Sequence, residues 1–147
     1  MFKPNNILIA TDFTDESDTA LREGLDIAEK FQSSVHVLHV IEDIQQCAVD
    51  YCLSEPDIMA EKNKLREEGM QKIEAELRRL ARERRIPLIK EIRFGNTVDE
   101  IVKYEGEKKI DLVITAPHRS QKRRWKNVPH LTQSLVNKSL CETMVVR

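Results

Sequence analysis

The sequence has few of the residues that mark fibrous, low-complexity or disulfide-stabilised chains. Its 147 residues include only four glycines, five prolines and three cysteines. So little glycine and proline excludes collagen-like and low-complexity classes. The cysteines, Cys47, Cys52 and Cys141, are odd in number and lack the C-x2-C spacing of a zinc or redox motif. Free thiols in a reduced, cytoplasmic interior are the simplest interpretation.

Long hydrophobic runs and an excess of charge of one sign are also missing. The first apolar run covers residues 7–10 and is too short for a signal sequence or a membrane span. Lysine and arginine number 24 against 25 aspartates and glutamates. This balance gives no reason to expect a nucleic acid or a membrane as partner. We expect a cytoplasmic chain that folds as a single domain over residues 1–147.

The hydrophobic pattern alternates between the periods of strands and helices. Apolar runs predict strands at residues 6–11, 35–41, 86–94, 111–116 and 143–146. Apolar residues at helical spacing predict helices at residues 17–31, at 58–84, from 97 onward and at 131–136. Thr97 and Glu100 have the spacing of a capping box. Strict alternation predicts an open, Rossmann-like α/β fold with five parallel strands and helices on both faces.

Several of these segments resemble the universal stress protein family. The opening strand delivers Asp12 before a helix start rich in serine and threonine, and residues 35–42, 111–114 and 141–147 are similar to the family's second, fourth and fifth strands. The similarity spans essentially the whole chain in the family's order. It implies a sheet in the order 3-2-1-4-5 and a homodimer formed through the C-terminal strand.

ATP-binding members of this family carry the motif G-x2-G-x9-G-[S/T] between the fourth strand and the last helix. The spacing is kept here at Ala116, Arg119, Pro129 and His130, but every residue type has changed. Glycines in such loops reach positive φ and let backbone N–H groups approach phosphate closely. The changes add side chains, remove a backbone donor at Pro129 and remove a hydroxyl at position 130. We therefore expect weak or no ATP binding.

A basic segment gives the opposite indication. Five cations lie within residues 119–126, and four of them, Arg119, Lys122, Arg123 and Arg124, are candidate anion-binding residues. Arginine binds phosphate bidentately without glycine geometry. A nucleotide-binding switch that holds ATP with Mg²⁺ through a reshaped basic loop is therefore the alternative.

The resemblance also places two residues beside the nucleoside part of a ligand. Asp12 matches the family's aspartate after strand one, and Val40 matches the position where strand two lines the adenine region. Asp12 is equally well explained as the cap of the next turn, bonded to nearby backbone. Val40 is better explained as a core residue than as a ligand contact.

No catalytic or metal-binding pattern stands out. His36 and His39 are three apart on a strand and should point to opposite faces, so they cannot share a metal. No nucleophile has an adjacent base in the sequence pattern. We expect a non-enzymatic regulatory or binding protein of the stress response, working as a dimer or as a docking module for a protein partner.

Overall fold

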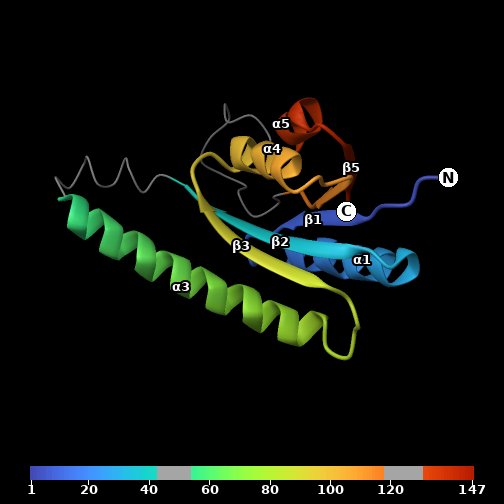
Figure 1. The fold of residues 1–147 in the computed structure, drawn as a ribbon, viewed down its shortest axis with the longest axis horizontal. Coiled ribbons are helices and arrows are strands. Elements are labelled where there is room, and N and C mark those ends of the chain that lie inside the picture. Colours follow the sequence, from blue (N-terminus) through green and yellow to red (C-terminus); the bar gives the residue numbers. More distant parts are fainter. Residues whose placement is uncertain (43–53, 118–130) are drawn as a thin grey trace.

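Five parallel strands form one sheet in the order β3-β2-β1-β4-β5 (Figure 1). The structure, a computed structural model, describes residues 1–42, 54–117 and 131–147. The strands are β1 (Asn6–Ala10), β2 (Ser34–Ile41), β3 (Leu88–Phe94), β4 (Leu112–Thr115) and β5 (Glu142–Val145). The helices are α1 (Asp15–Phe31), α3 (Glu55–Leu80), α4 (Thr97–Glu107) and α5 (Leu131–Lys138). The predicted parallel sheet and its order are confirmed.

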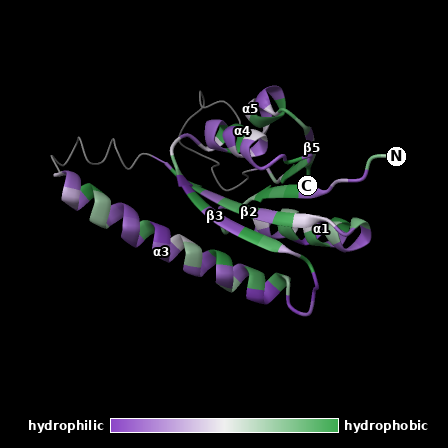
Figure 2. Ribbon diagram, viewed as in Figure 1, coloured by the Kyte–Doolittle hydropathy of each residue, from purple (hydrophilic) through white to green (hydrophobic). Residues whose placement is uncertain are grey.

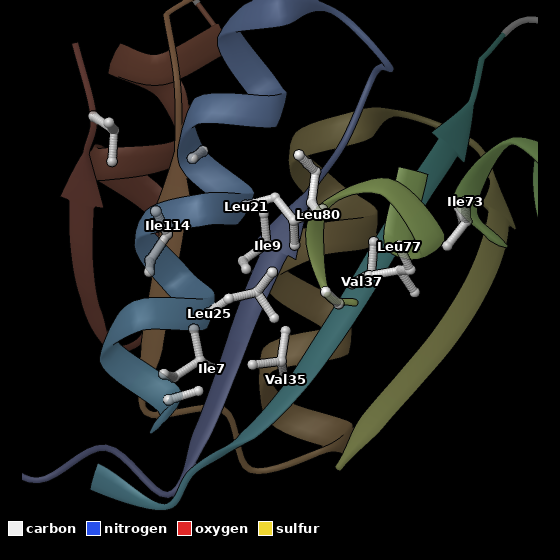
Figure 3. Close-up of a cluster of buried hydrophobic side chains, with 14 of the residues drawn as sticks. Ile7, Ile9, Leu21, Leu25, Val35, Val37, Ile73, Leu77, Leu80 and Ile114 are labelled. Atoms are coloured by element: carbon white, nitrogen blue, oxygen red, sulfur yellow. The ribbon is translucent and has the colours of Figure 1, made fainter. Parts of the chain in front are cut away.

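The helices cover both faces of the sheet. Figure 1 shows α1 and α3 on one side and α4 and α5 on the other. The larger core cluster lies beneath α1 and α3, where Ile7 and Ile9 of β1 pack against Leu21 and Leu25 of α1 (Figure 3). A second cluster beneath α4 and α5 surrounds the fully buried Tyr104. Alternate residues of the central strands contribute to the two clusters, which is why those strands are predominantly apolar.

Close packing of α1 on β1 depends on one glycine. A β-carbon added to Gly24 would lie 2.3 Å from Cδ1 of Ile9. No other residue fits this helix so near the strand without displacing that isoleucine.

The helix ends refine the predicted boundaries. α1 begins at Asp15 because the side chain of Thr14 accepts a hydrogen bond from Ser17 N. α3 begins at Glu55, with Ser54 as its N-cap, and ends at Leu80 rather than near residue 84. Glu83 follows with a φ of 69°, and a residue at positive φ cannot continue a right-handed helix.

The predicted capping box at the start of α4 is wrong. Asn96, one residue earlier, is the N-cap, and its Oδ1 accepts a hydrogen bond from Asp99 N at 3.1 Å. Thr97 instead donates its backbone N–H to Glu42 Oε1 at 2.9 Å. Asparagine and threonine are both good caps. Glu42, at the end of β2, binds Thr97, and Asn96 therefore becomes the cap.

Candidate functional site

Asp12 and Val40 lie at the same level at the carboxyl ends of neighbouring strands, Asp12 just after β1 and Val40 near the end of β2. Ala10 pairs with Leu38 across β1 and β2, and each of the two candidate residues follows two positions later. Val40 is half-buried and packs against the cluster beneath α4 and α5. The carboxyl ends of adjacent parallel strands are where open α/β sheets bind ligands. The structure thus brings together the two residues that the resemblance placed beside a nucleoside.

The Asp12 carboxylate holds the turn that enters α1. Its Oδ1 accepts hydrogen bonds from the backbone N–H of Thr14 at 3.1 Å and from the Thr14 hydroxyl at 2.5 Å. Thr14 is itself the N-cap of α1. The structural interpretation of Asp12 is therefore confirmed, while its contact with a nucleoside stays a prediction.

The methyl group of Ala116 faces away from Val40. Ala116 is 9% exposed and belongs to the cluster beneath α1 and α3, in the layer opposite to Val40. The added β-carbon at this motif position therefore fills core space and leaves the Val40 side of the sheet unobstructed. The other motif positions, Arg119, Pro129 and His130, lie outside the described residues, as do the candidate anion-binding residues Lys122, Arg123 and Arg124.

A small pocket opens at the same edge of the sheet. It measures about 220 Å³ and lies between the start of α1 and the ends of β4 and β5. Among the described residues, its lining carries Asp15 and Glu16 against a single cation, Arg147. Two carboxylates in the lining oppose an anionic ligand, so the described part of this pocket does not favour phosphate.

A buried polar network supports the turn that carries Asp12. The hydroxyl of Thr11 donates to Glu76 Oε2 at 3.1 Å, lies 3.1 Å from Ser17 Oγ and accepts from Phe13 N at 3.1 Å. Phe13 has a φ of 65°, in the left-handed region. Residues from β1, α1 and α3 thus fix one strained turn.

Glu76 is the unusual member of this network. It is 3% exposed, and burial, followed by its hydrogen bond with Asp18, raises its pKa from 4.5 to about 8. Glu76 Oε1 and Asp18 Oδ1 have no other hydrogen-bond partner among the described residues, and one proton on Glu76 satisfies both oxygens. Burial alone would raise the pKa of Asp18, but the guanidinium of Arg79, 2.8 Å away, holds that pKa below its ordinary value.

The sequence carries a signal for this network in the apolar stripe of α3. Glu76 lies on the apolar stripe of α3 formed by Ile73, Leu77 and Leu80, which all face the core. A single acid on such a stripe indicates a buried carboxyl group with dedicated partners.

The two strand histidines lie in opposite layers, as the strand alternation predicts. His36 Nδ1 is 2.7 Å from the hydroxyl of Tyr104 in the α4 layer. His39 Nδ1 is 2.7 Å from the backbone oxygen of Thr11, and its ring stacks near Phe13 with centroids 4.5 Å apart. Burial lowers the pKa of both rings. Hydrogen bonds and packing within the protein therefore account for both histidine side chains.

The described residues contain neither a membrane-spanning helix nor a cluster of metal-binding side chains. Within residues 1–42, 54–117 and 131–147, no helix is long and apolar enough to cross a membrane. The same part of the chain brings no three histidine, cysteine, aspartate or glutamate side chains together as a metal site.

The sheet order, the two helical layers and the polar residues at the strand ends define an open, doubly wound α/β protein with its candidate ligand site at the carboxyl edge. The model of the universal stress protein family matches residues 3–147. The chain belongs to the universal stress protein family.

Solved structures agree with this assignment at the level of the fold. The hypothetical protein MJ0577 aligns with a TM-score of 0.77 at 24% identity, covering 99% of this chain and 96% of its own. Universal stress protein UspA from Lactobacillus plantarum aligns at 0.78 with 19% identity over the whole of both chains. A universal stress protein from Archaeoglobus fulgidus in complex with dAMP aligns at 0.60 with 14% identity, covering 99% and 100%. Among curated protein sequences no significant match is found.

Proposed function

We propose that this protein is a cytoplasmic, non-catalytic binding protein of the stress response that acts as a homodimer and binds ATP weakly or not at all. The replacement of all three motif glycines and of the final hydroxyl residue carries this proposal. Phosphate binding by such a loop needs backbone N–H groups that approach the ligand closely. Pro129 has no backbone N–H, and arginine at position 119 disfavours positive φ.

The exposed surface near β5 supports the homodimer. Within the described residues β5 is an edge strand paired only with β4. Val136, Leu140 and Val145 expose 47%, 72% and 36% of their surface around this edge. Pairing of two β5 strands would satisfy open backbone groups and cover these side chains.

An adenine-nucleotide switch is the second candidate. It is favoured by the position of Asp12 beside Val40 and by the methyl of Ala116, which is turned into the opposite layer. Family members have been solved with cAMP and with dAMP. In the nucleotide switch, the cations of residues 119–126 would bind the phosphate groups in place of the glycine loop, with Mg²⁺ as counter-ion.

Calorimetric titration of nucleotide-free protein with ATP and Mg²⁺ separates the two candidates. We expect no measurable heat from the natural chain. The matched variant A116G/R119G/P129G/H130S restores the family's motif, and we expect it to gain ATP binding. Micromolar binding by the natural chain would reject the first candidate in favour of the nucleotide switch.

Light scattering on the same samples tests the dimer. The expected mass is that of two chains with or without nucleotide. Val145→Asp places a carboxylate at the β5 edge and should yield a monomer with unchanged circular dichroism. A monomeric natural chain at micromolar concentration would contradict the proposal.

A further inference from the structure

The second edge of the sheet, β3, carries unused backbone hydrogen-bonding groups. Within the described residues β3 pairs only with β2, and Val35 N donates to the backbone oxygen of Pro87. Alternate residues of a strand turn their backbone groups to the same neighbour, so the odd-numbered residues of β3 face β2. Leu88, Lys90 and Ile92 therefore turn their N–H and C=O groups toward the open edge.

A groove runs beside this edge, between β3 and the C-terminal half of α3. It has a volume of about 730 Å³ and is lined by Glu74, Leu77, Arg78, Ala81, Arg82, Leu88 and Lys90. Its apolar part is formed by Leu77, Ala81 and Leu88, which border the core cluster. Figure 2 shows hydrophilic and hydrophobic residues alternating along α3 where the helix runs beside β3.

The rim of the groove is positively charged. Arg78, in the last turn of α3, and Arg82, in the turn that follows the helix, are both exposed, and neither forms an ion pair with any described residue. The third cation, Lys90, lies 3.4 Å from Glu74, the single acid among the described residues that line the groove. The two arginines therefore leave an uncompensated positive potential over an apolar floor.

We propose that β3 and the adjoining α3 groove bind an extended peptide in which acidic and apolar residues alternate, as a sixth strand of the sheet. This surface is separate from the β5 edge and from the ends of the strands, so the proposal goes beyond the function proposed above. Backbone hydrogen bonds to β3 provide affinity, and side chains on the two faces provide specificity.

The alternation follows from the two faces of the sheet. On the α3 face, alternate side chains of the added strand meet Arg78 and Arg82, which favour carboxylates. On the opposite face Ile89 is 38% exposed and favours an apolar neighbour.

Charge also argues against a second copy of this chain as the occupant. Two β3 edges in a symmetric pair would bring together two sets of Arg78, Arg82 and Lys90. Like charges across a strand pair are destabilising, and lysine on an edge strand is a common guard against self-pairing. The same three cations would attract the carboxylates of an acidic strand.

The test uses the full-length protein and a fluorescein-labelled heptapeptide of alternating valine and glutamate. Fluorescence anisotropy should show saturable binding that weakens as salt is raised. A peptide with lysine in place of every glutamate should bind at least tenfold more weakly. Equal binding of the two peptides, or no saturation by the acidic one, overturns the proposal.

Matched variants locate the binding surface. Arg78→Glu with Arg82→Glu reverses two attractions and should weaken the acidic peptide about tenfold or more. Arg85→Glu changes an exposed arginine outside the groove and should alter binding less than about twofold. Unchanged binding by the double variant overturns the proposal.

A backbone variant tests strand addition itself. Lys90→Pro removes an N–H that points to the open edge and leaves the ladder to β2 intact, so it should abolish binding while circular dichroism is preserved. Retained binding would contradict strand addition. Without peptide, the natural chain could form a tetramer that the double arginine variant does not form. That result would show a second copy of the chain on this edge and would overturn the proposal.

Discussion

Replacing Glu76 by glutamine removes a titratable proton from beneath α1 while preserving shape and hydrogen bonds. The glutamine carbonyl can accept from the Thr11 hydroxyl, and its amide can donate to Asp18 Oδ1. The natural carboxyl group makes the same two bonds only while it is protonated. Its pKa is about 8 in the folded chain against an ordinary value of 4.5.

The sign of the pH dependence follows from these two values. Below pH 4.5 both the folded and unfolded chains carry the Glu76 proton, and the group contributes no pH dependence. Between pH 4.5 and about 8 only the folded chain keeps it, so the free energy of unfolding falls as pH rises, by about 1.4 kcal/mol per pH unit. Above pH 8 the loss is complete, at up to about 5 kcal/mol.

Urea unfolding followed by circular dichroism at pH 5 and pH 8.5 measures this effect. At pH 5 the natural chain and Glu76→Gln should agree within about 1 kcal/mol. At pH 8.5 the variant should be more stable, and the difference between the two should have grown by about 4 kcal/mol. Protein concentration is held constant so that association contributes equally.

The control is Glu68→Gln, an exposed carboxylate on the same helix. Its unfolding free energy should stay within about 0.5 kcal/mol of the natural chain at both pH values. If the curves of the natural chain and Glu76→Gln are parallel across this range, Glu76 is not protonated in the folded chain. The assignment of a shared proton to Glu76 and Asp18 is then wrong.

Three further substitutions test the packing and the caps. Gly24→Ala should destabilise the fold by about 1–3 kcal/mol in urea, because its methyl would overlap Ile9, which must shift. Asn96→Ala should cost about 1 kcal/mol and lower the hydrogen-exchange protection of the first turn of α4, and an unchanged first turn would contradict the cap assignment. Tyr104→Phe removes the hydroxyl bound to His36 and should lower the free energy of unfolding by about 1 kcal/mol. An unchanged free energy would mean that a water molecule replaces the hydroxyl.

The strands of the central sheet were predictable because their local pattern and their tertiary environment agree. β1 and β4 are buried on both faces, so all their positions except the terminal Asn6 and Thr115 are apolar and the pattern needs no knowledge of orientation. The order of the strands came from the resemblance to the family, since hydrophobic periodicity does not specify which strands are neighbours. The first residue of α4 was predicted correctly, but its cap was mispredicted because Asn96 and Thr97 are both good local caps.

The candidate site was predictable only in part. Asp12 and Val40 were found through the family's pattern, and the strand register places them at the same level. The direction of the Ala116 methyl depends on the alternation of β4 between two core layers, which local sequence does not specify. Glu76 stands 65 residues from Thr11 in the chain, and only the packing of α3 on the sheet brings them together.

The sequence by itself determined the type and succession of the elements, because hydrophobic period and capping act over a few neighbouring residues. It also determined the loss of the glycine motif, which is a matter of residue identity alone. Only the tertiary structure decided that Glu76 and Asp18 share a proton, that the methyl of Ala116 fills the core, and that β3 borders a cationic groove. Those features depend on contacts between residues far apart in the chain, and such contacts exist only after the helices pack on the sheet.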